Sequence, residues 1–312
     1  IRIQVIAHFL IFCSFSAAFC QNYNYVQFTT KDGLPGMTVY DICQDNDGYI
    51  WCATDNGLAR FDGKTFKTYT IEDGLPDNDV LTIMSDKKGR IWIGTFKNEV
   101  SYYYKGQIFN KFNDTILAKI NIQRSVNHFH ETNFGSVMIS DLNSYYEVKS
   151  SKLVKLIYEK SDRSKSNVGS FGYDWLGGEF GYVIGDSLFQ YNGTLAKFIR
   201  KIDVSGLRKF VYGRPNSSGD TPKLQIPYTP IRITTAGGMP LFVSTVDGSY
   251  RFDTSSIKFN NHFLPGKTVS NTFIDKEGNL WFSTVGYGLF KLSAYSNSIN
   301  KVYSYLDYQE SI

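Results

Sequence analysis

The chain has 312 residues, of which 42% are hydrophobic and 16% aromatic, and its net charge is +4. This length can bury a large core, but it exceeds one ordinary compact domain unless that domain is a barrel, a propeller or a solenoid. The small net charge gives no support for nucleic-acid binding, which a concentrated basic face would indicate. The 22 Tyr and 24 Phe residues favour β-strands.

Residues 1–20 differ in kind from the rest of the chain. After Arg2 they contain no acidic or basic residue other than His8. Their apolar run is shorter than the ~20 residues of a membrane span, and it ends in small residues. We predict a secretory signal peptide over 1–20 and an extracytoplasmic or periplasmic mature chain over 21–312. An uncleaved anchor is the alternative, whereas lipidation of Cys20 is disfavoured because Phe19 stands where a small residue is needed.

The mature part begins with a series of short strands separated by turn residues. Strands are predicted over Tyr23–Thr30, Val39–Cys43, Tyr49–Thr54 and Leu58–Phe61. The turns between them contain Asp, Asn and Gly, which tolerate or supply the left-handed backbone conformation. After Asp62-Gly63, the segment Thr65–Tyr69 is predicted to open the next unit.

This unit recurs along the chain. Val39–Gly63 is followed 41 positions later by a close copy, Val80–Gly106, and a third clear copy occupies Val269–Phe290. The shared positions are Asp45, Gly48, Trp51 and Thr54, then Asp86, Gly89, Trp92 and Thr95, and finally Asp275, Gly278, Trp281 and Thr284. A period of about 40 residues with four short strands predicts an all-β fold, a β-propeller of four-stranded antiparallel blades.

Weaker copies bring the countable repeats to six. Val126–Leu153 fits with Gly135 at the turn glycine and Met138 at the tryptophan position. Ser170–Gly193 fits in two ways, with either Trp175 as its tryptophan or Tyr191-Asn192-Gly193 matching Phe61-Asp62-Gly63. Leu241–Asp253 supplies the second half of a fifth unit through Thr245, Gly248 and Phe252-Asp253, and Lys267–Leu292 is the sixth.

Two regions depart from the repeat. Arg214–Pro230 contains four of the eight prolines and is predicted to be an inserted loop or an irregular blade. Inserted loops on such scaffolds often carry binding, although a solvated insertion without a role is equally consistent. Near the end, Val302–Tyr305 is typical of the first strand of another blade. We expect seven blades, with the seventh in the stretched region, shared between the termini, or beyond residue 312.

The repeat resembles the two-component regulator propeller family. The resemblance rests on Asp32-Gly33-Leu34-Pro35 and Asp73-Gly74-Leu75-Pro76, each followed by the Gly, Trp and Thr positions, and on Gly278–Trp281 with Thr284. It implies a seven-bladed propeller from the periplasmic sensor region of membrane-bound histidine kinases, including hybrid two-component systems. It also implies that adjoining domains form a homodimer. Membrane attachment and a kinase are implied as well, in segments that this sequence does not contain.

No residue pattern indicates catalysis. There is no serine-hydrolase elbow, no zinc-protease motif and no phosphate-binding loop. Asp45–Gly48 resembles part of a calcium loop but lacks the distal Glu, so a hairpin turn is preferred. His128, His130 and Glu131 could share a strand face, but only His262 remains as a further imidazole, which is a weak basis for a metal site. We predict no catalytic, metal or cofactor residues, and the ligand-binding residues stay unassigned.

Two further features have simple structural readings. Cys43 and Cys52 flank one hairpin, so a disulfide is conceivable in an exported protein. Their counterparts Met84 and Ile93 are plain apolar residues, which favours buried free thiols. The repeated tryptophans and the leucines of the DGLP segments are expected to pack between blades.

These observations lead to three functional hypotheses. The first is a non-enzymatic, exported propeller that senses a ligand, such as a glycan or another protein domain, for a two-component system. The second is a propeller enzyme, a lyase or glycosidase acting on polysaccharide. The third is a structural scaffold for protein interactions.

Overall fold

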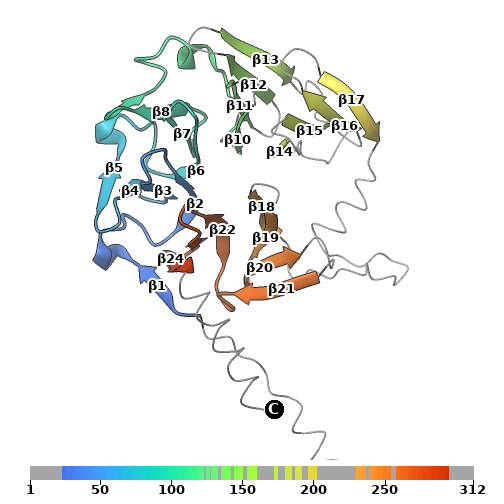
Figure 1. Cartoon of the computed structure of the whole chain (residues 1–312). Helices are drawn as coiled ribbons and strands as arrows, with labels where there is room; N and C mark the ends of the chain where they lie inside the picture. The colour runs from blue at the N-terminus through green and yellow to red at the C-terminus, as the bar shows by residue number, and fades with distance from the viewer. Residues whose placement is uncertain are drawn as a thin grey trace, which may run out of the picture.

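The computed structural model consists of four-stranded antiparallel sheets arranged around a common axis (Figure 1). It describes residues 23–122, 124–126, 128–132, 135–141, 144–149, 153–159, 172–174, 180–184, 187–191, 196–201, 230–236, 239–253 and 258–294. Six such sheets, here called blades, lie within these residues. The all-β propeller prediction is therefore confirmed.

The blades follow one another in chain order. The first comprises β2 (Val39–Gln44), β3 (Ile50–Thr54), β4 (Gly57–Phe61) and β5 (Phe66–Tyr69), and the second β6 (Val80–Ser85), β7 (Ile91–Thr95), β8 (Val100–Tyr104) and β9 (Gln107–Phe109). The third comprises β10 (His128–Glu131), β11 (Val137–Ser140), β12 (Ser144–Lys149) and β13 (Leu153–Glu159), and the fourth β14 (Gly172–Asp174), β15 (Phe180–Ile184), β16 (Ser187–Tyr191) and β17 (Ala196–Lys201). The fifth comprises β18 (Pro230–Ala236), β19 (Met239–Thr245), β20 (Gly248–Asp253) and β21 (Lys258–Phe263), and the sixth joins β22 (Val269–Ile274), β23 (Leu280–Thr284) and β24 (Leu289–Leu292) to β1 (Tyr25–Phe28).

The sixth blade is shared between the two ends of the described chain. β1 pairs antiparallel with β24, so that Tyr25 lies opposite Leu292 and Phe28 opposite Leu289. The predicted strand at Tyr23–Thr30 is thus the outer strand of the last blade. The prediction that Thr65–Tyr69 opens the second repeat was wrong. β5 is the outer strand of the first blade, because the short turn at Asp62 folds it back onto β4.

Six blades account for the six repeats that the sequence allows us to count. The expected seventh blade is not among the described residues, and seven blades stay a prediction. The candidate strand Val302–Tyr305 and the predicted signal peptide lie outside the described part. So does the predicted insertion at Arg214–Pro230, except for Pro230, which begins β18.

Strand register identifies the weak repeats. Met138 pairs with His130 as Trp51 pairs with Cys43, so Met138 does occupy the tryptophan position. Phe242 does so in the fifth blade, where it lies opposite Thr234.

In the fourth blade Phe180 pairs with Tyr191 as Ile50 pairs with Phe61. The alignment on Tyr191 is therefore correct. Gly181 takes the tryptophan position, and the alternative that placed Trp175 there was wrong.

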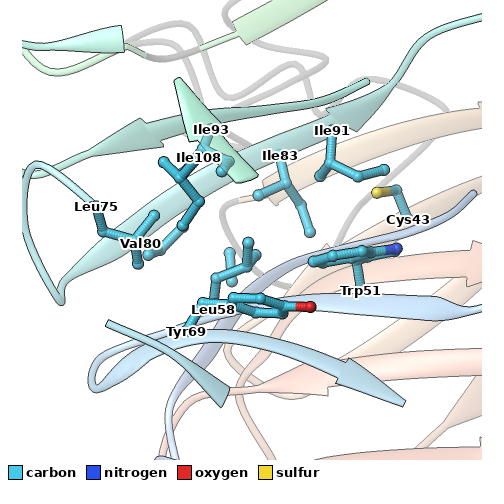
Figure 2. Packing of buried hydrophobic residues seen from close by; sticks show 11 residues of the cluster. Cys43, Trp51, Leu58, Tyr69, Leu75, Val80, Ile83, Ile91, Ile93 and Ile108 are labelled. Carbon is cyan, nitrogen blue, oxygen red and sulfur yellow. The ribbon is translucent and has the colours of Figure 1, made fainter. Parts of the chain in front are cut away.

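The core consists of apolar layers between neighbouring blades. Trp51, which is 1% exposed, packs with Ile83 and Ile91 of the second blade (Figure 2). Leu75, from the loop that leads into β6, lies in the same layer. Leu34 holds the equivalent place between the sixth and first blades, next to Trp281. The predicted packing roles of the tryptophans and of the DGLP leucines are confirmed.

The two cysteines are buried free thiols, as expected. They lie on opposite faces of the first blade, because Cys43 joins the layer toward the second blade and Cys52 the layer toward the sixth. Burial raises the pKa of both thiols, and the carboxylate of Asp41 adds to the rise. Both therefore act as small apolar side chains.

Candidate functional site

The antiparallel blades give the propeller two faces that differ in composition. The hairpin face carries the turns between the first and second strands, which the structure describes at 45–49, 86–90 and 275–279 and in part at 132 and 135–136. The loop face carries the segments that lead into the innermost strands, at 29–38, 70–79 and 264–268, and the turns between second and third strands. The first and last described strands, β1 and β24, begin and end respectively at the hairpin face.

On the hairpin face, one aspartate organises each turn of the strong repeats. The Oδ1 atom of Asp45 accepts the backbone N–H groups of Asp47 and Tyr49 at 3.0 and 2.9 Å. Its Oδ2 atom accepts the indole N–H of Trp51 at 2.6 Å. The predicted hairpin turn is confirmed, and this carboxylate is engaged by donors of the chain itself.

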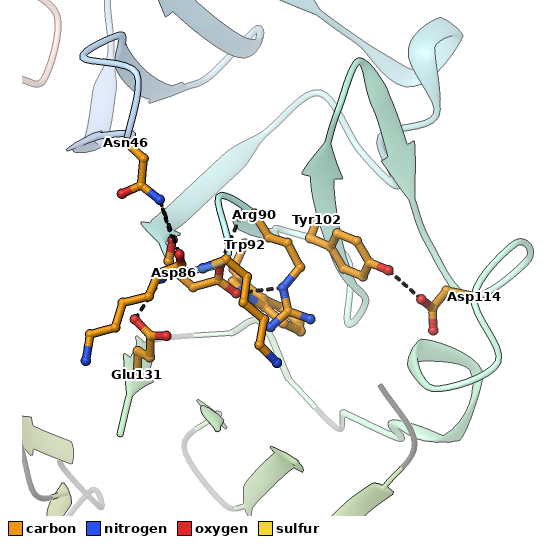
Figure 3. A network of polar contacts seen from close by, with 9 residues as sticks. Asn46, Asp86, Arg90, Trp92, Tyr102, Asp114 and Glu131 are labelled. Carbon is orange, nitrogen blue, oxygen red and sulfur yellow. Dashed lines mark hydrogen bonds and ion pairs between the residues drawn. The ribbon is translucent and has the colours of Figure 1, made fainter. Parts of the chain in front are cut away.

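The second blade adds a cation to this arrangement. Trp92 Nε1 donates to Asp86 at 2.9 Å, and Arg90 Nε donates to the same oxygen at 2.6 Å (Figure 3). The guanidinium of Arg90 also lies 4.7 Å from the centre of the Trp92 ring. A buried indole N–H needs a partner, and the turn aspartate supplies it.

Contacts between turns then link neighbouring blades across this face. Lys276 Nζ donates to the carbonyl oxygen of Asp45 at 2.8 Å, and Gln44 Nε2 donates to Glu277 at 3.0 Å. Asn46 Nδ2 reaches the carbonyl of Lys87 at 3.4 Å, and the Lys87 amide donates to Glu131 at 2.9 Å (Figure 3). The hairpin face is thus fastened from the sixth blade to the third.

A buried carboxylate holds three blades together near the axis. Asp41 in β2 is 1% exposed. It accepts hydrogen bonds from Asn271 of the sixth blade at 2.8 Å and from Thr82 of the second at 2.9 Å. A register shift recurs at this point in each of these innermost strands. Such bulges re-aim side chains, and here they direct polar groups between blades.

On the loop face, the DGLP segments are more than tight turns. Each begins with a one-turn 3-10 helix, η1 (Thr30–Asp32) or η2 (Ile71–Asp73), closed by a capping box. Asp32 and Asp73 accept the amides of Thr29 and Thr70, both at 2.8 Å. These caps fix the course of the loops before the buried leucines.

Glycines at the start of the third strands fasten these loops to the preceding blade. The Gly57 amide donates to the carbonyl of Asn78 at 2.6 Å, and the Gly288 amide donates to that of Met37 at 2.8 Å. Gly57 has φ +120°, and a Cβ there would lie 2.6 Å from the carbonyl oxygen of Tyr69. Only glycine fits such a position.

The loop face differs from the hairpin face in exposing apolar side chains on these fixed loops. Phe96, Val246 and Val285 come directly after the repeated threonine in three blades, and each of the three is exposed. The amides of Phe96 and Val285 donate to the carbonyl oxygen of the residue directly before the innermost strand of the same blade, at 2.8 and 3.0 Å. These positions are therefore equivalent around the axis.

Three carboxylates lie beside this surface. Burial raises the pKa of Asp79, and the neighbouring carboxylates of Asp77 and Asp55 add to the rise, while a hydrogen bond from Tyr40 lowers it. The Oδ1 atom of Asp79 is buried and has no hydrogen-bond partner among the described residues. We call Asp55, Asp77 and Asp79 the acidic trio.

The histidines considered for metal binding are not brought together. His128, His130 and Glu131 lie on β10 of the third blade, whereas His262 lies on β21 of the fifth. The His262 ring stacks on Tyr250 at 4.2 Å, and its Nε2 lies 2.6 Å from the carbonyl oxygen of Asp247. Within the described ranges, no group of three or more His, Cys, Asp or Glu side chains is placed to hold a metal ion. No helix in these ranges is long and apolar enough to span a membrane.

Comparison with known proteins agrees with the repeat. The family model described as "Two component regulator propeller" matches residues 33–56, 74–97 and 264–286. A stretch of 51 residues is 51% identical to "Histidine kinase P4" of Formosa agariphila, and it covers 16% of this chain and 4% of that protein.

Solved structures share the fold at low sequence identity. The extracellular domain of the putative hybrid two component system BT3049 from B. thetaiotaomicron gives a TM-score of 0.65 at 18% identity, over 87% of this chain and 42% of that chain. A streptogramin B lyase gives a TM-score of 0.67 at 14% identity, over 87% of this chain and 98% of that chain. The three repeat matches lie in blades of the kind described above, so this chain is a β-propeller that carries two-component regulator propeller repeats.

Proposed function

We propose that this propeller is the ligand-sensing part of a two-component sensor, that it lies outside the cytoplasm, and that it is not itself catalytic. The observation that carries the proposal is the set of three matched repeats, at 33–56, 74–97 and 264–286. The short match to a histidine kinase supports the link to a kinase. The chain spans only 4% of that kinase, so a kinase output belongs to the proposal.

Two observations support a place outside the cytoplasm. The signal-like composition of residues 1–20 predicts export. Two structures with the same fold are described as extracellular domains of putative two-component or one-component systems, at TM-scores of 0.65 and 0.60.

The fastened blades suggest how sensing would work. The links from Lys276 to Asp45, from Asn46 to Lys87 and from Lys87 to Glu131 run between turns, and Asp41 joins three blades near the axis. A ligand on such a body is expected to bias its position relative to a neighbouring domain by a small rigid-body shift. A glycan is our first candidate ligand.

A propeller enzyme is the second candidate, because lyases share the fold over nearly their whole length. The two readings differ in what happens to the ligand. An enzyme acting on polysaccharide must release shortened or unsaturated products, whereas a sensor returns its ligand unchanged.

The experiment is a thermal-shift screen of residues 21–312 against neutral and anionic oligosaccharides, with monosaccharides as the matched controls. A ligand that binds only the native state at 100 times its Kd should add about 2.7 kcal/mol to the unfolding free energy. A concentration-dependent rise in Tm with intact oligosaccharide supports sensing. No response to any oligosaccharide opposes the glycan version, and cleavage of one opposes the non-catalytic reading.

A further inference from the structure

Exposed apolar side chains are concentrated on the loop face. The described residues leave seven large apolar side chains exposed, and only Val26, on the outer strand β1, lies away from the loop face. The other six are Ile71, Phe96, Phe112, Val246, Val285 and Tyr287. Single exposed apolar residues are ordinary, but a concentration on one face marks an interaction surface.

Three of them lie on connections of the loop face that lead into, turn within and lead out of the second blade. Ile71, Phe96 and Phe112 are 55%, 64% and 85% exposed, and we call them the apolar triad. Each stands on a different connection, respectively η2, the turn after β7 and the turn after β9.

Hydrogen bonds tie these connections to one another. Lys97 Nζ donates to the carbonyl of Pro76 at 2.8 Å, which joins the turn after β7 to the loop after η2. Asn110 Nδ2 donates to the carbonyl of Gly74 at 2.9 Å, and Lys111 pairs with Glu99 at 2.7 Å. The triad is therefore presented on a preorganised frame, which lowers the entropic cost of binding.

The same bonds argue against a sugar at this patch. The nearby polar side chains already bond to the frame, as Lys97, Asn110 and Lys111 do. A sugar needs several free donors and acceptors, whereas large apolar side chains of a polypeptide need only the surface that Phe96, Phe112 and Ile71 offer. Aromatic side chains, Phe among them, are enriched at protein interfaces.

The charge beside the patch defines the partner further. The acidic trio adjoins it, because the Asp79 carbonyl accepts the Phe96 amide at 2.8 Å and Asp77 lies on the segment after η2. Within the trio, Asp55 is exposed and Asp77 is half-buried, so their carboxylates are within reach of a partner. A complementary partner must bring a cation to this edge.

The two ends of the described chain lie away from this face. β1 begins and β24 ends at the hairpin face, where Tyr25 pairs with Leu292. The two ends of the described chain therefore lie on the face opposite the patch.

We propose that the apolar triad and the acidic trio together form a docking surface for a polypeptide segment of another protein, one that carries large apolar side chains next to Lys or Arg. The apolar side chains lie against Phe96 and Phe112, and the cation lies against the trio. This inference does not depend on a sensing role, because it rests only on the surface itself.

The test uses residues 21–312 and a displayed library of random 12-residue peptides, from which selected peptides are synthesised and their Kd values measured by fluorescence polarisation. The proposal predicts peptides that combine aromatic or aliphatic residues with Lys or Arg. Their Kd should rise at least tenfold in Phe96→Ser and Phe112→Ser and several-fold in Asp77→Asn, and the loss in Asp77→Asn should shrink at high salt.

Val26→Ser is the matched control, because it also removes an exposed apolar side chain, and it should leave Kd within twofold. Phe112 is too exposed for its replacement to threaten folding, which the Tm of each variant verifies. Peptides without basic residues, or binding that both Phe variants leave unchanged, would overturn the proposal. So would self-association of the chain that Phe96→Ser and Phe112→Ser abolish, since the occupant would then be a second copy.

Discussion

The carboxylate of Asp45 accepts the indole N–H of Trp51 at 2.6 Å, and the same spacing of six residues recurs wherever the repeat is strong. The weak blades change both members of the pair together. The third has Thr132 and Met138, and the fifth has Ala236 and Phe242. Neither Met nor Phe carries the N–H that the carboxylate would accept. The aspartate is thus present where a buried donor requires it.

This relationship predicts coupling between the two side chains. Asp45→Ala leaves a buried indole N–H and two turn amides without their acceptor, which should cost about 2–4 kcal/mol of unfolding free energy. Asp45→Ala with Trp51→Phe, the pair found in the fifth blade, should cost at least ~1 kcal/mol less than the sum of the single changes. Urea denaturation measures all three variants. If the costs of Asp45→Ala and Trp51→Phe add up in the double variant, the hydrogen bond between the two side chains has no energetic role. Asp62→Ala, in an exposed turn, is the control.

Two glycines allow the stability cost of a left-handed backbone to be measured separately from the cost of a Cβ clash. Gly57 and Gly63 both have positive φ, +120° and +98°, but only Gly57 would bring a Cβ against a backbone oxygen. Gly63→Ala should therefore cost only about 1–2 kcal/mol from the left-handed conformation. Gly57→Ala should cost clearly more, because it must also move β5 away from β4. Thermal unfolding of the pair tests this, and equal losses of Tm would refute the role of the close contact.

The bridge near the axis predicts a second coupled pair. Asn271→Asp places two carboxylates against each other in a buried site and should destabilise the protein by several kcal/mol. Adding Asp41→Asn restores a donor and an acceptor between β2 and β22, so the double variant should be more stable than Asn271→Asp alone. Chemical denaturation gives the free energy of unfolding of the wild type, the single variants and the double variant. A double variant no more stable than Asn271→Asp would show that this contact does not join the blades.

The thiols predict a pH dependence of stability. Burial raises the pKa of Cys43 and Cys52 in the folded state, so the unfolded chain loses these protons first as pH rises. Stability should therefore decline above about pH 8.5, the ordinary pKa of a thiol, and Cys43→Ala with Cys52→Ala should flatten part of that decline. Native residues 21–312 should resist alkylation at both thiols and react fully after unfolding. Rapid native labelling would contradict their burial.

The sequence predicts much of this fold because one short pattern recurs. Trp51, Trp92 and Trp281 mark three of the blades. Two alternating strands on either side of an Asp-Gly turn can form little else than an antiparallel hairpin. It does not predict the outer strand of each blade. As a local pattern, the segment at Thr65–Tyr69 pairs equally well with the strand before it and with the strand after it. The closure of the sixth blade by β1 joins residues too far apart for any local signal.

The candidate surface was largely hidden from sequence reasoning. Ile71, Phe96 and Phe112 share no motif, and they come together only because three connections are tied by Lys97, Asn110 and Lys111. The only signal was the apolar residue directly after the repeated Thr, as in Phe96, Val246 and Val285. By contrast, Asp45 was correctly read as a turn residue, although its bond to Trp51 was missed because the six-residue spacing has no meaning until the strands are paired.

Isothermal titration calorimetry of residues 21–312 with the oligosaccharide that gives the largest thermal shift tests the central claim most directly. Sensing without catalysis predicts heats that saturate at a fixed molar ratio, with the oligosaccharide recovered at its original mass. Heat release that continues after each injection, together with shortened or unsaturated products, would instead show an enzyme and contradict the account.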